Sequence, residues 1–173
     1  MILATPFAVA FGSNRGVCES FLKTAAGNLY SAPGCRRLRM SPLYRTQPVG
    51  MENGAEFLNA VGLGETMLAA VELLSLFQRL EREAGRGKES RRVGPPWEDR
   101  ELDLDLLFHG RTIRHEPRLT LPHPRLADRR FVLEPLRQVC PSWTHPETGL
   151  TVDEMIAGLP ETPWVRLEKE NWL

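Results

Sequence analysis

An α+β fold, in which helices pack on an antiparallel sheet, is predicted by the order of the apolar segments along the chain. Four segments have the composition of strands and two have helical spacing, and they follow one another as β-α-β-β-α-β. This order is typical of a ferredoxin-like sandwich. With 173 residues, 42% of them hydrophobic, the chain is expected to bury a full core as a single domain over residues 1–173.

The first strand and the first helix are predicted at the amino-terminal end. Residues 7–11 form a short apolar run that ends at Gly12-Ser13-Asn14. Either Ser13 or Asn14 could cap the helix that follows, because both side chains can accept hydrogen bonds from the unpaired N–H groups of a first helical turn. Apolar residues at helical spacing place this helix over about residues 17–30.

Two more strands and an amphipathic helix are expected next. Residues 37–44 alternate well enough for a strand, and residues 57–63 have the composition of another. Helical spacing predicts a helix over residues 69–83, which Gly85 ends. Residues 85–99 then lack apolar periodicity, as is usual for a functional lid or a disordered loop.

A buried strand over residues 100–108 completes the pattern and carries two acids. Asp103 and Asp105 are two residues apart, so on a strand they point to the same face, about 6.6 Å from each other. The opposite face carries three leucines that are expected in the core, Leu102, Leu104 and Leu106. Beyond residue 122 we expect short helical pieces, the last over residues 151–157.

Composition argues against several classes of protein. The formal net charge is zero, which disfavours a nucleic-acid partner bound by a basic field over the whole domain. No signal peptide is seen and no apolar stretch approaches the roughly 18 residues of a membrane span, so no membrane partner is expected. The scattered Cys18, Cys35 and Cys140 suit a reducing cytoplasm better than a disulfide framework or a thiolate zinc site.

The acid pair indicates a site for a hard cation. Two carboxylates at this spacing repel each other by about 2.5 kcal/mol at an effective dielectric of about 20. Mg²⁺ relieves such repulsion, and it is commonly shared between one or two carboxylates and substrate phosphates. The alternative is a solvated strand face with two ordinary acids. Arg100 and the basic residues of the 85–99 loop favour phosphoryl transfer, because guanidinium groups bind phosphate oxygens, although basic loop residues can also be merely solubilising.

Other polar motifs are less specific. The run Gly12-Ser13-Asn14-Arg15-Gly16 lacks the ending of a P-loop, so a plain strand-to-helix turn is the preferred interpretation. His123 lies between two prolines, in a turn that could present it to a ligand, although a lone histidine is more often structural. Asn59 could recognise the edge of a heterocycle through its amide.

Several short motifs follow one another along this chain. Each is weak alone, but their order and spacing together are highly specific. The motifs are Gly12-Ser13-Asn14, Tyr44-Arg45-Thr46, Pro48-Val49-Gly50, Phe57-Leu58-Asn59, Glu81 with Gly85-Arg86, Arg100 through Asp105, Pro122-His123-Pro124 and Arg129 to Phe131. From residue 7 to about residue 141, the chain thereby resembles the 6-hydroxymethyl-7,8-dihydropterin pyrophosphokinase family of folate biosynthesis. The resemblance implies a ferredoxin-like fold and transfer of pyrophosphate from ATP to the hydroxymethyl group of the reduced pterin, with release of AMP. It implies ATP and the reduced pterin as partners, and no obligate protein partner.

The resemblance also implies roles for individual residues. The catalytic residues would be Arg86, Arg100, Asp103 and Asp105, with the two acids holding two Mg²⁺ ions on the ATP phosphates. The ATP site would be lined by Gln78, Glu81, Arg86, Trp97, Arg100, Arg118, Thr120, His123 and Arg129. The pterin site would be lined by Thr46, Gln47, Val49, Phe57, Asn59, Trp97 and Phe131, with Phe57 and Phe131 on either side of the ring.

Two other classes of protein are weaker alternatives. A nucleotidyltransferase also combines Gly-Ser with Asp-x-Asp, but there the two motifs lie close in sequence, whereas Ser13 and Asp103 are far apart. A non-catalytic ferredoxin-like module that binds RNA would carry a run of aromatic residues and glycine on a central strand. The strand here carries acids instead, which repel phosphate unless a metal is bound.

Overall fold

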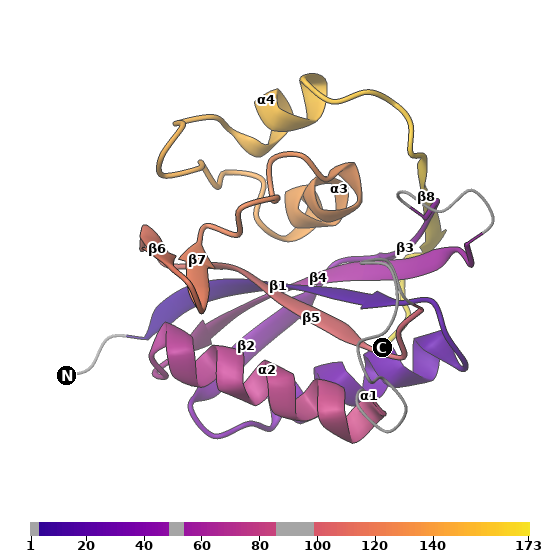
Figure 1. The fold of residues 1–173 in the computed structure, drawn as a ribbon, viewed down its shortest axis with the longest axis horizontal. Coiled ribbons are helices and arrows are strands. Elements are labelled where there is room, and N and C mark those ends of the chain that lie inside the picture. Colours follow the sequence, from indigo (N-terminus) through magenta and orange to yellow (C-terminus); the bar gives the residue numbers. More distant parts are fainter. Residues whose placement is uncertain (1–3, 49–53, 86–98) are drawn as a thin grey trace.

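A computed structural model describes residues 4–48, 54–85 and 99–173, and its centre is an antiparallel sheet (Figure 1). The sheet has the order β5-β1-β4-β3-β8, and β2 pairs with the same β4 strand. Its strands are β1 Thr5–Ser13, β2 Cys35–Met40, β3 Leu43–Thr46, β4 Phe57–Thr66, β5 Asp103–His109 and β8 Val165–Lys169. With β2 and β3 taken together, the first five strands have the order expected for β-α-β-β-α-β, which confirms the predicted fold class.

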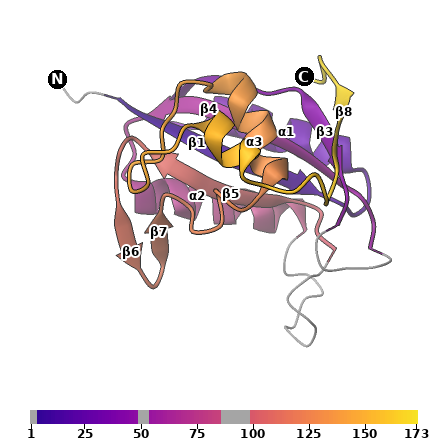
Figure 2. The ribbon, with the colours of Figure 1, turned by 90° about the horizontal axis from the view of Figure 1, so that it is seen from above.

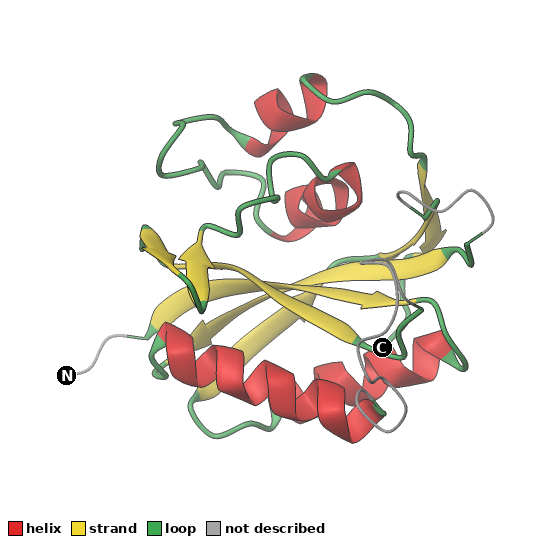
Figure 3. Ribbon diagram, in the orientation of Figure 1, coloured by secondary structure: helices red, strands yellow, loops and turns green. Residues whose placement is uncertain are grey.

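Helices cover both faces of the sheet (Figures 1 and 3). The helices α1 Cys18–Tyr30 and α2 Ala70–Ala84 lie on one face, as the sequence predicts. On the other face lie α3 Arg130–Val139 and α4 Val152–Ala157, which add a third layer to the two-layer sandwich (Figure 2). In the part of the chain that the structure describes, no helix is both long and apolar enough to cross a membrane.

The alternation of side chains along the strands explains the two apolar layers. Phe7, Val9 and Phe11 of β1 point toward α1 and α2, and they pack with the leucines of the acidic strand in one buried cluster. This confirms the core positions predicted for Leu102, Leu104 and Leu106. Ala8 of β1 and Val61 of β4 point the other way and pack under α3 and α4.

The single strand predicted over residues 37–44 is wrong, because the chain forms two strands there. Ser41 and Pro42 separate β2 from β3. Pro42 has no N–H to donate to a ladder, and Ser41 replaces the missing ladder contact. The Ser41 N–H donates to the Val61 carbonyl (2.8 Å), and the Ser41 Oγ accepts from the Val61 N–H (3.0 Å).

The predicted cap of the first helix is also wrong. The residue before α1 is Val17, and no side chain caps this helix. Ser13 is instead the last residue of β1, where its buried Oγ has no hydrogen-bond partner in the described structure. The Asn14 side chain bonds to the segment before β5, so it is used for tertiary structure and not for the helix.

Three short strands are not foreseen by the sequence pattern. The strands β6 Arg114–Glu116 and β7 Leu119–Leu121 form a separate hairpin after β5. The strand β8 is formed by the carboxy-terminal tail, which adds antiparallel to β3. Behind β8, the buried Trp172 indole donates from Nε1 to the Ser41 carbonyl at 2.8 Å.

Candidate active site

The register of the sheet places Asp103 and the amide of the expected pterin site in one row. Asp103 of β5 is paired with Gly12 of β1, and Gly12 is paired with Asn59 of β4. Paired residues of neighbouring strands point to the same face, and this is the face that α3 covers. A Cβ on Gly12 would lie 3.2 Å from the Asn59 Oδ1 and 3.9 Å from the Asp103 Cβ, so the glycine keeps the space between acid and amide clear.

Each acid of the pair faces an arginine. The Arg100 guanidinium donates from Nη1 to the Asp103 Oδ1 at 2.8 Å, and the Arg129 guanidinium donates from Nη1 to the Asp105 Oδ2 at 3.2 Å. The side chains of Asp103 and Asp105 are 26% and 33% exposed, so both remain within reach of a ligand. The two guanidinium groups offset the repulsion that the sequence predicts between the acids.

His123 completes the surroundings of Asp105. Its Nδ1 accepts from the Arg125 N–H at 3.2 Å, and its Nε2 lies 3.7 Å from the Asp105 Oδ2. Because Nδ1 accepts, a neutral ring carries its proton on Nε2, which faces the acid. Burial lowers the pKa of His123, and the charge of Asp105 opposes that effect. His123 is therefore suited to donate a hydrogen bond from Nε2 toward an anionic group beside Asp105.

The start of α3 brings an aromatic ring to the same place. Arg129 directly precedes the helix, and its guanidinium lies over the Phe131 ring, 5.5 Å from the ring centroid. Burial lowers the pKa of Arg129, and the charge of Asp105 opposes that effect. One short segment therefore supplies both the cation that faces Asp105 and an aromatic face.

The amide and hydroxyl expected at the pterin site are in direct contact. The Asn59 Nδ2 donates to the Thr46 Oγ1 at 2.7 Å, and both side chains are buried. Phe57 is paired with Thr46 across β3 and β4, so it points to the same face as Asn59 and Thr46. A buried amide held by a neighbouring hydroxyl is fixed in orientation, which suits recognition of a planar heterocycle.

Two polar side chains, those of Asn14 and Glu81, hold the acidic strand in place, although the sequence suggests other roles for both. Asn14 accepts from the Arg100 N–H at 2.7 Å and donates to the Asp99 carboxylate at 2.6 Å. The Arg100 carbonyl accepts in return from the N–H groups of Asn14 and Arg15. Asn14 thus positions Arg100, a role that its place in Gly12-Ser13-Asn14 does not reveal. The buried Glu81 carboxylate accepts from the Leu104 N–H at 2.9 Å, which anchors β5 to α2.

Other predicted site residues are not brought into contact with the acids by the described structure. Gln78 is exposed on α2, Arg118 is exposed beside the β6–β7 hairpin, and Thr120 is half-buried in β7. Gln47 is exposed just after β3. Val49, Arg86 and Trp97 lie outside the described residues, as do the other basic residues of the predicted lid, Lys88, Arg91 and Arg92.

The donor set at Asp103 and Asp105 fits Mg²⁺ on a phosphorylated substrate. Over residues 4–48, 54–85 and 99–173, no three His, Cys, Asp or Glu side chains cluster as a self-sufficient metal centre. Two partly exposed carboxylates on one strand face are instead the partial set that Mg²⁺ completes with water and phosphate oxygens. The residues present are therefore suited to a metal that arrives with its nucleotide.

Comparisons with known proteins identify a matching family. The model of the family described as 7,8-dihydro-6-hydroxymethylpterin-pyrophosphokinase matches residues 8–141. The 2-amino-4-hydroxy-6-hydroxymethyldihydropteridine pyrophosphokinase of Bacillus subtilis is 37% identical over 146 residues, which cover 84% of each chain. The protein of the same description from Porphyromonas gingivalis is 39% identical over 140 residues, or 80% of this chain and 92% of that one.

Some similar proteins are much longer than this chain. The folic acid synthesis protein fol1 of Schizosaccharomyces pombe is 36% identical over 152 residues, which are 88% of this chain and 20% of that protein. The crystal structure of Plasmodium falciparum HPPK-DHPS A437G superposes with a TM-score of 0.71 at 13% identity, over 91% of this chain and 46% of that one. At this identity the structural match supports the fold alone, and the chain spans less than half of that protein.

Proposed function

Because the chain belongs to the 7,8-dihydro-6-hydroxymethylpterin-pyrophosphokinase family, we propose that Asp103 and Asp105 hold the Mg²⁺ of its ATP substrate. The enzyme transfers pyrophosphate from ATP to the hydroxymethyl group of 6-hydroxymethyl-7,8-dihydropterin in folate biosynthesis, with release of AMP. The metal assignment is supported by the pair of partly exposed carboxylates on one face of β5, each of which faces a cationic side chain. We propose two Mg²⁺ ions, held by Asp103 and Asp105.

The arginines beside the acids are proposed to bind the transferring group. Mg²⁺, when bound, neutralises charge on the phosphate oxygens and holds them for in-line attack. Arg100 and Arg129 then exchange a carboxylate partner for phosphate oxygens, which guanidinium groups bind as readily. His123 donates from Nε2 to the same anionic region. Together these groups stabilise the charge that develops at the transferring phosphorus.

The side chains of Thr46 and Asn59, which contact each other, are proposed to bind the pterin. The Asn59 amide pairs with polar atoms on the ring edge, while Phe57 and Phe131 cover the two faces of the ring. Gln47, Val49 and Trp97 are proposed to complete this pocket. The hydroxymethyl group would then lie toward Asp103, since only Gly12 separates Asn59 from that acid in the sheet register.

The remaining ATP contacts are proposals from the sequence motifs. They concern Gln78, Glu81, Arg86, Trp97, Arg118 and Thr120. Asp103 is the candidate general base for the proton that the hydroxymethyl group loses. The carboxylates are engaged by cations, which makes them weak bases, so positioning and electrostatic stabilisation supply most of the rate.

We also propose that residues 1–173 form one catalytic domain that acts in the cytoplasm. The main sheet contains both the first strand, β1, and the last strand, β8, which supports one folding unit. The three cysteines are free thiols, which suits a reducing compartment.

The metal assignment is tested by Asp105→Asn, which keeps the shape of the side chain and removes its charge. We expect the rate of AMP formation to fall by about a thousandfold, because charge stabilisation at the phosphates is lost. Mg²⁺-dependent binding of a non-hydrolysable ATP analogue, measured by calorimetry, should weaken in parallel. The matched control is Asp153→Asn on the outside of α4, where the side chain is 71% exposed, and its activity should not change. Full activity of Asp105→Asn would overturn the assignment, and ADP as product would contradict pyrophosphoryl transfer.

A further inference from the structure

The carboxy-terminal tail is bound along the whole length of β3. It lies beyond residue 141, where the match to the family model ends. At one end of β3, the buried Trp172 donates to the Ser41 carbonyl, and at the other the Gln47 N–H donates to the Trp164 carbonyl at 3.2 Å. Between these ends β8 pairs antiparallel with β3, and the register shifts once, between Leu43 and Tyr44. The edge of β3 is therefore covered by the tail and is not open to solvent.

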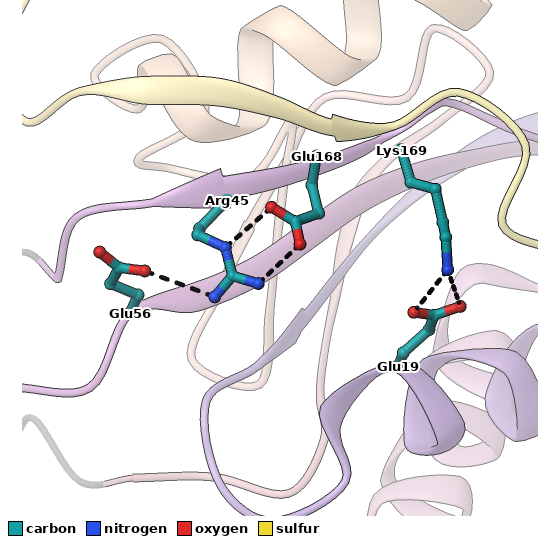
Figure 4. Close-up of polar contacts among 5 residues, drawn as sticks. All are labelled: Glu19, Arg45, Glu56, Glu168 and Lys169. Atoms are coloured by element: carbon teal, nitrogen blue, oxygen red, sulfur yellow. Dashed lines mark hydrogen bonds and ion pairs between the residues drawn. The ribbon is translucent and has the colours of Figure 1, made fainter.

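Arg45 joins three segments at the point where this tail meets β3 and β4, the strands of the proposed pterin site (Figure 4). Its guanidinium donates to both oxygens of Glu168 on β8, from Nε at 2.8 Å and from Nη2 at 2.7 Å. A third contact, from Nη1 to the Glu56 carboxylate at 3.4 Å, reaches the residue that precedes β4. A two-pronged contact of this kind fixes the direction of both side chains, unlike a single-point contact.

The neighbours of Arg45 and Glu56 in sequence are residues of the proposed pterin pocket. Thr46 follows Arg45 on β3, and Phe57 follows Glu56 at the start of β4. Successive residues of a strand point to opposite faces, so Arg45 holds the backbone from the side away from the pocket. A shift of Arg45 or Glu56 along the strands would therefore move Thr46 and Phe57 with it.

We propose that Arg45 is a positioning residue for the pterin pocket, and that Glu168 of the carboxy-terminal strand is its anchor. This proposal rests on the proposed placement of the pterin against Thr46, Asn59 and Phe57. Through the Arg45–Glu168 contact, the tail holds the ends of β3 and β4 in register, so that the hydroxyl of Thr46 meets the Asn59 amide. A second ion pair, Lys169 with Glu19 at 2.9 Å, ties the same tail to α1 (Figure 4).

The Arg45–Glu168 contact is expected to affect substrate affinity more than the stability of the fold. The side chains of Arg45 and Glu168 are 39% and 36% exposed, and ion pairs of such exposure contribute little to the free energy of folding. Displacing a binding group by a fraction of an ångström, by contrast, is enough to weaken a well-formed pocket. The contact is expected to set KM for the pterin while leaving KM for ATP unchanged, since Arg45 has no contact with the acid pair.

The test compares KM values for both substrates in Glu168→Gln and Arg45→Met. We expect KM for the pterin to rise about fivefold in each variant. KM for ATP and the thermal midpoint should be nearly unchanged. The double variant should be no worse than either single one, because both remove the same contact. Arg45→Lys, which keeps the charge but not the two-pronged geometry, should give an intermediate value.

The matched control is Glu65→Gln. Glu65 contacts Arg36 at 3.0 Å and Arg37 at 2.9 Å, so it bridges two arginines on the same sheet. It lies near the opposite end of β4 from Phe57, and this variant should leave both KM values unchanged. An equal rise of pterin KM in Glu65→Gln would show a general loss of sheet rigidity and would overturn the specific role of Arg45.

The variant Asn59→Ala distinguishes a failure of the positioning role from a failure of the proposed pterin pocket. If Asn59→Ala raises KM for the pterin and the Arg45 and Glu168 variants do not, the positioning role is wrong and the pocket stands. If Asn59→Ala leaves KM for the pterin unchanged, the pocket assignment fails, and the positioning role fails with it. A rise in all three variants supports both.

Discussion

At the scale of single residues, buried polar side chains determine how the acidic strand is held. Asn14 accepts from the backbone N–H of Arg100 and donates to the Asp99 carboxylate, and Glu81 accepts from the backbone N–H of Leu104. A buried polar group is costly unless it is bonded, so each of these bonds fixes one position of the strand. The orientation of Asp103 therefore depends on hydrogen bonds that fix the backbone on either side of it.

Ser13 and Ser41 allow this principle to be tested in a matched pair. Both serines are buried, but the Ser13 Oγ has no partner in the described structure, whereas the Ser41 Oγ accepts from the Val61 N–H. Ser13→Ala should raise the free energy of unfolding by about 1 kcal/mol, because an unsatisfied buried hydroxyl is removed. Ser41→Ala should lower it by about 1–3 kcal/mol, because a buried N–H loses its acceptor.

Chemical denaturation of the two variants beside the wild type measures both changes. A loss of stability in Ser13→Ala equal to that in Ser41→Ala would mean that the Ser13 hydroxyl is bonded in solution.

At the scale of secondary structure, the same residue type has opposite consequences in a helix and in a strand. Gly27 lies on the exposed side of α1, where a Cβ would meet no atom within 4 Å. Gly64 of β4 lies opposite Phe7 of β1, and a Cβ there would come within 2.9 Å of the buried ring. The glycine of the strand is thus required by packing, and the glycine of the helix is not.

Alanine at each position should therefore act in opposite directions. Gly27→Ala should stabilise the protein by about 0.5–1 kcal/mol, since alanine loses less backbone entropy in a helix. Gly64→Ala should destabilise it by about 1–3 kcal/mol through overpacking against Phe7. Thermal midpoints that move the same way in both variants would contradict the packing described for β4.

At the scale of the whole molecule, ion pairs link segments that are distant in sequence. Glu19 on α1 binds Lys169 of the carboxy-terminal tail, Glu168 of the tail binds Arg45 on β3, and Glu65 joins β4 to β2. Hydrogen bonds from Lys169, Arg37 and Arg45 lower the pKa values of Glu19, Glu65 and Glu168, respectively, below the ordinary 4.5. These three carboxylates therefore favour the folded state when they are ionised.

The sign of their pH dependence follows from linkage. A carboxylate with a lowered pKa in the folded state binds fewer protons there than in the unfolded chain at pH values just below 4.5. Its stabilising contribution is complete above the unfolded pKa, and it is lost as the pH falls through the folded pKa. The thermal midpoint should thus decline below about pH 4.5. The triple variant Glu19→Gln/Glu65→Gln/Glu168→Gln should decline less steeply, and a curve parallel to the wild type would contradict these shifts.

The local features of this protein can be predicted from its amino-acid sequence. Helical and strand periods placed α1, α2, β1, β4 and β5 close to their observed bounds, since these periods depend only on which residues face the core. The period of two also placed Asp103 and Asp105 on one face. Motif order pointed to the family. The interruption at Ser41 and the short strands β6, β7 and β8 escaped this reasoning, because strands of three to five residues are too short for a period to be recognised.

Contacts between side chains that are distant in sequence follow from the tertiary structure alone. The strand order placed Gly12 between Asp103 and Asn59, and the return of the chain brought Arg129 to Asp105. The bond between Asn14 and Arg100 spans 86 positions, and that between Arg45 and Glu168 spans 123. Such contacts depend on strand order and register, which are set by the burial of the whole chain and not by any local period.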